Sequence, residues 1–454
     1  MSSIETDAAG EGATQCASGE IGRAVRRSYW QRIGGMPLSV DGDALPATAS
    51  IAIVGGGFAG LATALRIQEL EPAADVVVIE AETVGFGASG RNGGLMSPLP
   101  APVWLATALN NEQHARAMGL LNRKVAEAAR WAARLAPAAE VMAAPMALEA
   151  KGWITDAGLA HVSRVLDAAG IVHEFASRNK QRTPRALNAE AHTVNPYRLV
   201  RGLADAARKH GVKIVERAPV RAIEDLHGGG ARVLLADGRE LKAATVVIAA
   251  NAYTPSIAMP GKLHAKVVHN YMLATDPLPP DLVERLQKAG RSVGRFVVEL
   301  NAAYVFYRLH EGRLIFGGIE KLKAANGGDF DVPAAVMNGL RKHLAATLAV
   351  EPLPRIAEAW GGRFHMTATD LPIIRRAAAS SSIVLNVGYG GTGVALTLAL
   401  APVAAAQALA RPLLDRELSL IHDTISTTRL PVLGAMRFAA GVVATHFKER
   451  RARL

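Results

Sequence analysis

Residues 50–60 read SIAIVGGGFAG, and this stretch decides the fold of the 454-residue chain. Its first half is apolar and rich in β-branched residues, which is typical of a strand buried in a parallel sheet. The glycines that follow match the G-x-G-x-x-G fingerprint of a dinucleotide-binding turn. In that turn Gly55 permits the sharp bend, Gly57 lets backbone amides approach a pyrophosphate, and Gly60 lets the next helix pack closely on the strand. The stretch therefore predicts a strand, a phosphate-binding turn and the start of a helix.

The residues after the turn complete a βαβ unit. Residues 61–70 favour a helix, and residues 75–80 form a second apolar strand that ends at Glu80. Glu80 comes twenty residues after Gly60, where a carboxylate accepts hydrogen bonds from the ribose of an adenosine. We therefore expect Glu80 and the following Ala81 to lie at the ribose. FAD and NAD share this arrangement, so the unit alone leaves both cofactors open, and an ordinary glycine turn with a solvated Glu80 is the alternative.

The composition narrows the class of protein. Half of the residues are hydrophobic and a fifth are charged, as in a globular enzyme of two or three domains. The net charge of +11 is spread along the chain and aromatic residues make up 5%, so no nucleic-acid partner is expected. The single cysteine, Cys16, excludes a disulfide framework and a cysteine metal cluster, and no metal site is predicted. These features favour a cytoplasmic protein with a small-molecule substrate.

Two later glycine-rich segments indicate a ligand longer than NAD. Residues 87–94, GASGRNGG, can place backbone amides and the Ser89 hydroxyl near a second phosphate or a flavin ring. Residues 388–394, GYGGTGV, open an apolar helix whose positive end suits the electron-rich pyrimidine side of a reduced flavin. We therefore predict FAD as the cofactor. A solvent loop and a purely structural turn are the alternatives for these two segments.

The rest of the pattern predicts an α/β protein, α+β overall, with a Rossmann-like FAD-binding domain that is discontinuous in sequence and a second, antiparallel-sheet substrate domain. Apolar strands near 245–250 and 383–387 are expected to return to the parallel sheet, and residues 101–181 to form helices. The apolar stretch 394–410 is interpreted as a buried helix rather than a membrane span. The predicted boundaries are an N-terminal tail at 1–45, FAD-binding segments at 46–100, 190–255 and 355–425, substrate-domain segments at 101–189 and 256–354, and a basic tail or helix at 426–454.

Several stretches, in order along the chain, resemble one family. They are GASGRNGG at 87–94, PYRL at 196–199, VVIAANA at 246–252, FGG at 316–318, WGG at 360–362 and DLP at 370–372. The chain resembles the D-amino-acid oxidase-type FAD oxidoreductases, especially the branch that contains γ-glutamylputrescine oxidase, over about residues 28–411. The resemblance implies oxidation of a small amine or amino acid, with hydride transfer from the carbon bearing nitrogen to flavin N5 and hydrolysis of the resulting imine. Because Cys16 lies in the tail, FAD is expected to be bound noncovalently.

The resemblance also implies roles for single residues. Val220 is expected to contact the adenine side through its backbone, and Ala250 to line the dinucleotide crevice. The full set predicted to bind the cofactor is Gly55, Gly57, Phe58, Ala59, Gly60, Glu80, Ala81, Ser89, Gly90, Arg91, Asn92, Gly93, Gly94, Val220, Ala250, Gly390, Gly391, Thr392 and Gly393.

No catalytic residue is assigned, and the substrate-site candidates are Arg308, Tyr304, Tyr271 and His365. Arg308 is suited to pair with a substrate carboxylate through its two-pronged guanidinium. The alternatives are a structural ion pair for Arg308, core packing for the tyrosines, and a buried histidine without a catalytic role.

The electron acceptor is left open. Some sarcosine-oxidase relatives use a lysine near the flavin to promote the reaction with oxygen, and the corresponding residues 313–317 contain none. Oxygen, a quinone and a carrier protein are therefore all retained. The apolar and basic C-terminus either packs as a helix with a solvated tail or makes weak contact with the inner face of a membrane. The rival functions are a flavin dehydrogenase of a 2-hydroxy acid and a noncatalytic FAD-holding electron-relay subunit.

Overall fold

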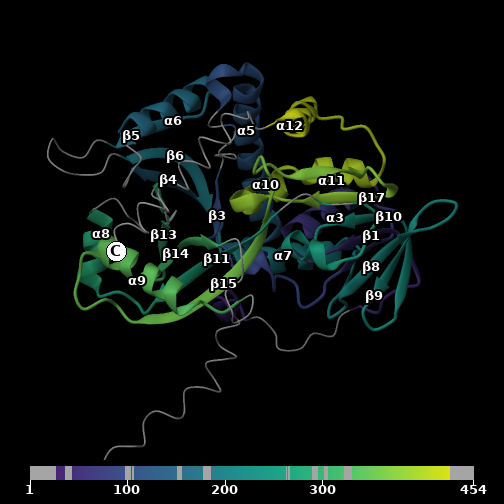
Figure 1. Ribbon diagram of the computed structural model, residues 1–454, viewed down its shortest axis with the longest axis horizontal. Coiled ribbons are helices and arrows are strands. Elements are labelled where there is room, and N and C mark those ends of the chain that lie inside the picture. Colours follow the sequence, from purple (N-terminus) through teal and green to yellow (C-terminus); the bar gives the residue numbers. More distant parts are fainter. Residues whose placement is uncertain are drawn as a thin grey trace, which may run out of the picture.

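The computed structural model describes residues 27–35, 43–97, 104, 107–150, 156–176, 186–261, 263, 266–288, 295–300, 305–321 and 330–429. These residues form two sheets that lie side by side, with helices packed around them (Figure 1). One sheet has a parallel centre and the other is largely antiparallel. The predicted fold class is therefore confirmed.

The first sheet is built around the stretch that carries the glycine turn. Its strand order is β16-β17-β10-β1-β2-β7, and β8 and β9 extend it from β10. The pairs β17–β10, β10–β1, β1–β2 and β2–β7 are all parallel. The strands are β1 (Thr48–Val54), β2 (Val76–Ile79), β7 (Lys213–Val215), β8 (Val220–Asp225), β9 (Ala231–Leu235), β10 (Glu240–Ile248), β16 (Ile373–Ala377) and β17 (Ser380–Val387).

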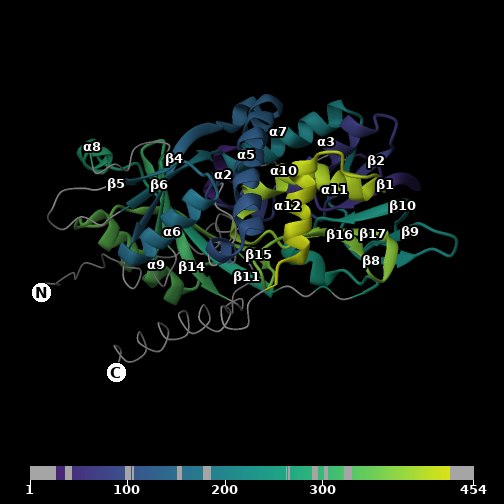
Figure 2. The same cartoon turned by 90° about the horizontal axis from the view of Figure 1, so that it is seen from above.

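Both faces of this sheet are buried, which explains why its central strands are apolar throughout. Along β1, Ile51 and Ile53 belong to one core cluster, whereas Ala52 and Val54 belong to another on the opposite face. The helices α3 (Phe58–Leu70), α7 (Pro196–Lys209) and α11 (Ala401–Ala408) contribute to the first cluster. The same cluster continues into α5 (Glu112–Leu135), which packs against α10 (Gly393–Ala399) and α12 (Arg416–Thr427), as Figure 2 shows from above.

The second sheet has the strand order β15-β11-β14-β13-β12-β4-β6-β3, with β5 paired to β6. Its pairs are antiparallel except for β12–β4. Two helices, α8 (Pro280–Lys288) and α9 (Ala334–Leu348), cover one face with a separate core cluster. The strands are β3 (Leu95–Met96), β4 (Met142–Ala150), β5 (His173–Ala176), β6 (Ala186–Thr193), β11 (Lys266–Thr275), β12 (Phe296–Leu300), β13 (Val305–His310), β14 (Arg313–Lys321) and β15 (Ile356–Met366).

The expectation that residues 101–181 are helical is wrong in part. Helices α5 and α6 (Asp156–Ala168) do form there, but β4 and β5 are strands of the second sheet. The sequence of β4, MAAPMALEA, is rich in alanine and carries no strand alternation of its own. Its pairing with β12 and β6 overrides that local preference, because a strand between two neighbours satisfies its backbone hydrogen bonds on both sides.

The expectation that residues 1–45 form a tail is also wrong in part. Residues 29–33 form helix α2 (Tyr29–Ile33), and Tyr29 and Trp30 are completely buried. Ser28 Oγ caps this helix by accepting a hydrogen bond from the Gln31 amide, and Gln31 Oε1 accepts one from the Ser28 amide. This reciprocal capping box was readable in the sequence as Ser28 followed three residues later by Gln31.

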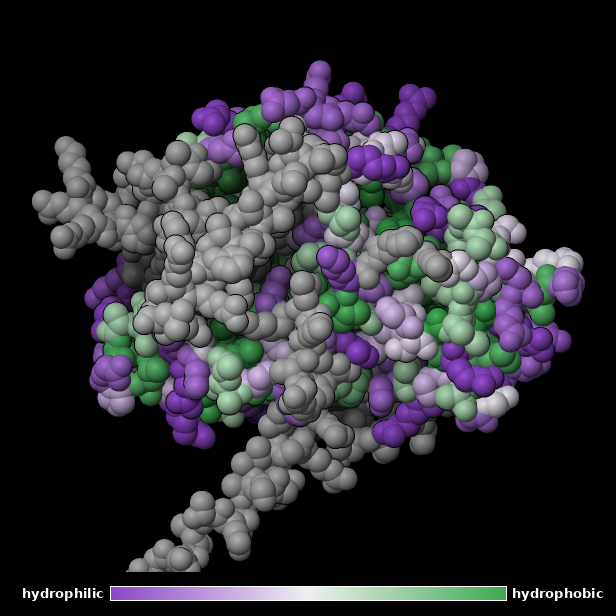
Figure 3. Space-filling view, in the orientation of Figure 1, coloured by the Kyte–Doolittle hydropathy of each residue, from purple (hydrophilic) through white to green (hydrophobic). Residues whose placement is uncertain are grey.

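The apolar stretch 394–410 is buried, as expected, but it is two helices rather than one. α10 and α11 are bent by 68° at the break near Leu400, and Pro402 stands in the first turn of α11. Within the described residues no single helix has the length and apolar character of a membrane span, although the segment Gly390–Ala399 together with α11 passes that test as a bent pair. On the face drawn in Figure 3, apolar side chains of the described residues are scattered among hydrophilic ones.

The predicted domain boundaries remain a prediction, and strand membership adds detail to them. β6 and β15 lie partly or wholly in segments assigned to the FAD-binding domain, yet both are strands of the second sheet. Cys16, Tyr304 and the C-terminal segment from residue 430 lie outside the described residues.

Candidate active site

A cavity of about 400 Å³ lies where the carboxyl ends of the parallel strands face the second sheet. Open α/β sheets bind ligands at this edge. Among the residues predicted to bind the cofactor, those on the cavity wall are Gly55, Gly57, Phe58, Ala59, Glu80, Ala81, Ser89, Arg91, Asn92, Gly93, Val220, Ala250, Gly390, Gly391 and Gly393. Gly60, Gly90, Gly94 and Thr392 adjoin these residues in the chain but do not line the cavity.

The glycine turn presents the start of α3 to the cavity. Gly55 has a φ of 118°, and a Cβ atom there would lie 2.6 Å from the Ala249 carbonyl oxygen, so no other residue type fits. Gly57, the residue before α3, supplies no side-chain cap, and the Phe58 amide donates a hydrogen bond to Ser89 Oγ at 3.0 Å. The positive end of α3 and the second glycine-rich segment therefore meet on the cavity wall, an arrangement that favours an anionic group.

The Glu80 carboxylate is fixed at the end of β2. One carboxylate oxygen accepts a hydrogen bond from the Gly56 amide at 2.7 Å, and the other accepts one from the Glu82 amide at 3.0 Å. Burial raises the pKa of Glu80 to about 7, although these two hydrogen bonds oppose the shift. A carboxylate has further lone pairs, so Glu80 can still accept hydrogen bonds from the two hydroxyls of a ribose.

The glycine-rich segment 85–94 is held in place by hydrogen bonds to its backbone carbonyls. Gln31 Nε2 donates to the carbonyls of Gly85 and Phe86 at 2.9 and 3.0 Å. Trp30 Nε1 donates to the Asn92 carbonyl, and Trp360 Nε1 donates to the Arg91 carbonyl, both at 2.9 Å. Because the donors come from α2 and β15, the shape of this loop depends on elements that lie far from it in sequence.

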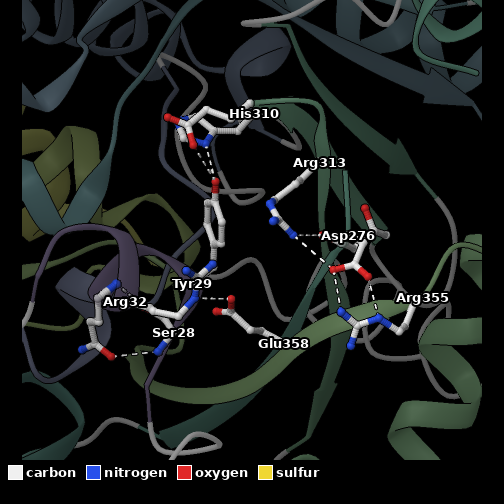
Figure 4. A network of polar contacts seen from close by, with 11 residues as sticks. Ser28, Tyr29, Arg32, Asp276, His310, Arg313, Arg355 and Glu358 are labelled. Atoms are coloured by element: carbon white, nitrogen blue, oxygen red, sulfur yellow. Dashed lines mark hydrogen bonds and ion pairs between the residues drawn. The ribbon is translucent and has the colours of Figure 1, made fainter. Parts of the chain in front are cut away.

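Helix α2 is itself anchored to the second sheet, as Figure 4 shows. The Tyr29 hydroxyl and His310 Nδ1 on β13 lie 2.9 Å apart, in hydrogen-bond contact. Arg32 forms an ion pair with Glu358 on β15. His310 Nε2 lies 3.1 Å from a carboxylate oxygen of Glu140, which continues the network into the loop before β4. The helix thus connects the second sheet to the loop beside the cavity.

Arg308 does not reach the cavity, contrary to expectation. Its side chain is 4% exposed, and its guanidinium donates to the carbonyls of Gly94 at 3.3 Å and Val194 at 3.0 Å. The guanidinium carbon lies 4.7 Å from the centroid of the Trp30 ring, so α2 covers it. Arg308 therefore supports the glycine-rich segment from behind. The sequence pattern does not reveal this, because Trp30, which covers Arg308, lies in the segment predicted to be a tail.

Two further substrate-site candidates point away from the cavity. Tyr271 is 2% exposed and belongs to the core cluster beneath α8 and α9, whereas its neighbours Asn270 and Met272 line the cavity. Side chains alternate between the faces of a strand, so the register of β11 decides which of them faces the ligand. His365 is completely buried, and burial lowers its pKa. Within the described residues, neither ring nitrogen of His365 has a hydrogen-bond partner.

The cavity side formed by the second sheet carries residues that the sequence did not single out. We call the part of it that lies on β11, β12, β13 and β14 the second-sheet wall; it comprises Asn270, Met272, Phe296, Val298, Phe306 and Glu320, whereas Leu95 of β3 and Gly362, Arg363 and Phe364 of β15 line the cavity beside it. The rings of Phe296 and Phe306 stack with their centroids 5.8 Å apart. The wall is thus mainly apolar, with an amide and a carboxyl group among its side chains. The alternation along each strand indicated which residues share a face, but not which face looks into the cavity.

The third glycine-rich loop is tied to α3 and to the loop after β15. The Tyr389 hydroxyl donates to Asn386, whose amide donates to Thr63 Oγ1 at 3.0 Å. Gly390 has a φ of 54°, and a Cβ atom there would overlap the Asp370 carboxylate. Burial raises the pKa of Asp370 to about 7, and the nearby Glu320 carboxyl adds to the shift. Asn386 and Tyr389 line the cavity; Asn386 was not predicted, and Tyr389 lies in the predicted segment 388–394 but was not among the residues assigned to the cofactor.

These features fit an FAD molecule in chemical character. The positive start of α3, where Gly57 provides no side-chain cap, suits a pyrophosphate, and the Glu80 carboxylate suits a ribose. The cavity continues past Ser89 to the loop at 390–393. Its lining is therefore more extensive than the adenosine half of a dinucleotide would require. A parallel sheet with this turn, closed by a second sheet across a long cavity, defines a dinucleotide-dependent enzyme with a separate substrate side.

Comparison with known proteins places the chain in a family. The family model described as FAD dependent oxidoreductase matches residues 50–407, and the chain belongs to this family. The protein is therefore an FAD-dependent oxidoreductase, and FAD is its cofactor. The matched region begins after α2, so the family model does not include the helix that holds the loop at 85–94.

Curated relatives and solved structures agree with this assignment. The chain is 28% identical to the γ-glutamylputrescine oxidoreductase of Escherichia coli, over 77% of this chain and 81% of that protein. It is 26% identical to the probable oxidoreductase OrdL of Rhizobium meliloti, over 77% and 80%. Its fold is similar to that of glycine oxidase from Geobacillus kaustophilus, with a TM-score of 0.66 and 17% identity over 81% of this chain and 96% of that one. L-proline dehydrogenase from P. horikoshii has a TM-score of 0.65, with 17% identity over 87% and 99%.

Proposed function

We propose that this enzyme oxidises a small amine or amino acid at the carbon that bears the nitrogen. The observation that carries the proposal is one continuous cavity whose lining passes from the glycine turn to the mainly apolar second-sheet wall. The relatives named above include enzymes whose names specify an amine, an amino acid or an imino acid as substrate. Together these support a carbon–nitrogen oxidation over the alternative, a 2-hydroxy acid dehydrogenase.

The residues that would hold FAD follow from the contacts described above. The start of α3, at Phe58 and Ala59, would bind the pyrophosphate, and Glu80 would accept hydrogen bonds from the ribose. Val220, like Glu80, lines the cavity, and it would adjoin the adenine. The segments at Ser89–Gly93 and Gly390–Gly393 would hold the flavin half, with backbone amides rather than charged side chains as the main donors.

When bound, FAD supplies a hydride acceptor for a carbon that bears a neutral amine, and the imine product is then hydrolysed by water. The chain itself positions the substrate and limits access of water. Met272, Phe296 and Phe306 provide apolar surface on the second-sheet wall, which orients an aliphatic part of the substrate and excludes water from it. Asn270 and Glu320 provide the polar contacts on the same wall.

The acceptor that reoxidises the enzyme is proposed to be oxygen, a quinone or a carrier protein. Residues 313–317 of β14 contain no lysine, so no residue of this stretch is assigned to the reaction with oxygen, and all three acceptors are retained. Oxygen uptake measured beside the reduction of a soluble quinone, with the same reducing substrate, distinguishes these acceptors.

Anaerobic mixing of the purified protein with amines, amino acids and 2-hydroxy acids tests the proposed reaction. We expect loss of the flavin absorption band with an amine or amino acid and no loss with the matched hydroxy acid. Bleaching by the hydroxy acid alone would replace the proposal with the dehydrogenase alternative. A protein that contains FAD but is bleached by none of these compounds would support the electron-relay alternative.

A further inference from the structure

A series of buried hydrogen bonds joins the loop at 390–393 to the start of α3. The Tyr389 hydroxyl donates to the side-chain oxygen of Asn386. The Asn386 amide donates to Thr63 Oγ1 at 3.0 Å, and Thr63 Oγ1 donates to the Ala59 carbonyl at 2.7 Å. We call the side chains of Tyr389, Asn386 and Thr63 the polar bridge. All three residues are buried, and the function proposed above uses none of them.

The direction of each hydrogen bond in the polar bridge follows from its last member. Because the Thr63 hydroxyl gives its only proton to the Ala59 carbonyl, it can only accept from Asn386. The NH2 group of Asn386 therefore faces Thr63, and its oxygen faces Tyr389. Burial raises the pKa of Tyr389, so the hydroxyl keeps its proton and remains a donor. Removal of either hydroxyl would thus take a close partner from the buried Asn386, which is costly in a site closed to water.

The two ends of the polar bridge lie at different parts of the proposed FAD site. Ala59 belongs to the start of α3, which would bind the pyrophosphate, and Tyr389 directly precedes the loop that would hold the flavin. Ala59, Asn386 and Tyr389 all line the cavity. The polar bridge therefore connects the two regions of the first-sheet side that would contact opposite halves of the cofactor.

The conformation of the loop at 390–393 depends on Tyr389. The amide and the hydroxyl of Thr392 both donate to the Tyr389 carbonyl, at 3.3 and 3.2 Å. The backbone of Tyr389 also forms an isolated β-bridge with Met366 at the end of β15. A shift of Tyr389 would therefore move the loop, together with the backbone amides of Gly390 and Gly391 on the cavity wall.

We infer that the polar bridge is a positioning device that holds this loop close to the start of α3, so that the loop amides favour reduced over oxidised FAD. Backbone N–H groups stabilise the form of the flavin that carries more negative charge, and their effect falls with distance. If the polar bridge is broken, the reduced form loses more stabilisation than the oxidised form, and the reduction potential falls. The inference rests on the placement of the flavin under the proposed function, and it adds the residues that set the potential.

Two substitutions break the polar bridge at opposite ends while they keep its shape. Tyr389→Phe removes the donor, and Thr63→Val replaces the hydroxyl with a methyl group. The midpoint potential is measured against a reference dye, and the Kd of oxidised FAD by titration of the apoprotein. In each variant we expect the preference for reduced FAD to fall about tenfold, which lowers the midpoint potential of a two-electron couple by about 30 mV. Thr63→Ser keeps the hydroxyl and should retain the wild-type potential.

Thr424→Val is the matched control for Thr63→Val. Thr424 is also completely buried, its hydroxyl donates to the Leu420 carbonyl at 2.7 Å, and it accepts a hydrogen bond from the Gln113 side-chain amide at 3.1 Å. It lies on α12 and does not line the cavity. Thr424→Val should therefore lower the melting temperature about as much as Thr63→Val does, without changing the midpoint potential.

The inference is overturned if the midpoint potential is unchanged or raised in either bridge variant that retains FAD. An equal fall in Thr424→Val, or a fall in Thr63→Ser as large as in Thr63→Val, would also overturn it. If Tyr389→Phe does not fold, the three threonine variants decide the question.

These measurements need no amine substrate, so they separate the inference from the proposed function. The expected fall in potential, in a protein that no amine or amino acid reduces, would support the inference and contradict the proposed function. An unchanged potential, in an enzyme that amines do reduce, would contradict the inference alone.

Discussion

The two sides of the cavity differ in how their residues are brought together. On the first-sheet side, Gly55, Phe58 and Glu80 lie within one βαβ unit, so local sequence fixes their spacing. On the second-sheet wall, neighbouring residues come from β11, β12, β13 and β14, and the face that they present depends on strand register. Sequence patterns can therefore locate a cofactor site whose residues lie within one short βαβ unit. They cannot locate a substrate site whose residues come from several strands of a sheet.

The largest expected loss of stability and of FAD binding comes from a substitution in the glycine turn of the βαβ unit. A Cβ atom at position 60 would overlap the Gly55 carbonyl oxygen, where α3 packs against the turn. Gly60→Val should therefore destabilise the protein by about 3 kcal/mol or abolish FAD binding, because overpacking here displaces backbone rather than a side chain. Thermal unfolding and flavin content measure both effects. Gly391→Ala provides a stability control, since no atom lies within 4 Å of the added Cβ; equal stability of the two variants would contradict the steric argument.

Removal of the ribose acceptor should have the next largest effect. Glu80→Ala is expected to weaken FAD binding by about 10- to 100-fold, the usual size for hydrogen bonds to a charged group. Fluorescence titration of the apoprotein with FAD gives the Kd. Asp75→Asn, at an exposed position just before β2, is the control. An unchanged Kd in Glu80→Ala would remove Glu80 from the site.

The pH dependence of FAD binding is a second test of the assignment of Glu80 to the ribose. Burial raises the pKa of Glu80 to about 7 in the protein without FAD, and the ionised form is the better acceptor for ribose hydroxyls. Protons therefore compete with FAD, and the Kd should rise about tenfold as the pH falls from 8 to 6. The dependence should be absent in Glu80→Gln. A Kd that falls on acidification would contradict this sign.

A substitution in α2, with a smaller expected effect, tests whether the shape of the loop at 85–94 depends on this helix. Trp30→Phe removes the hydrogen bond to the Asn92 carbonyl while keeping an aromatic ring against Arg308. We expect a loss of about 1–3 kcal/mol in stability, because the carbonyl is left without its donor, and weaker retention of FAD. Tyr29→Phe, which removes the contact with His310 instead, serves as the comparison. If Trp30→Phe melts earlier but holds FAD as tightly as the wild-type protein, α2 supports only the fold.

The smallest effect is expected on the face of β11 that looks away from the cavity. Tyr271→Phe should leave the substrate Kd and the flavin reduction rate within about twofold of wild type, because Tyr271 lies in the core beneath α8 and α9. Met272→Ala, one residue further on, removes cavity surface and should weaken substrate binding. The opposite ranking of the two variants would show that the register of β11 has been assigned to the wrong face.

The sequence by itself determined the parallel sheet, the glycine turn, the carboxylate at Glu80 and the identity of the cofactor. The glycine turn and Glu80 depend on residues that are close in the chain, where spacing and backbone sterics decide the geometry. The sheet and the cofactor were predicted from several such local patterns, at 87–94, 245–250 and 383–394. It also contains the signal for α2, in the capping box of Ser28 and Gln31.

Only the tertiary structure showed which residues of the second sheet line the cavity. Arg308 matched a family position, yet Trp30 covers it and its guanidinium is used on backbone carbonyls. Tyr271 was chosen over Asn270 because the alternation of a strand says which residues share a face, not which face meets the ligand. β4 became a strand through its pairing with β12 and β6, against its alanine-rich composition. In each case the outcome depends on contacts between segments far apart in the chain, which local sequence patterns do not record.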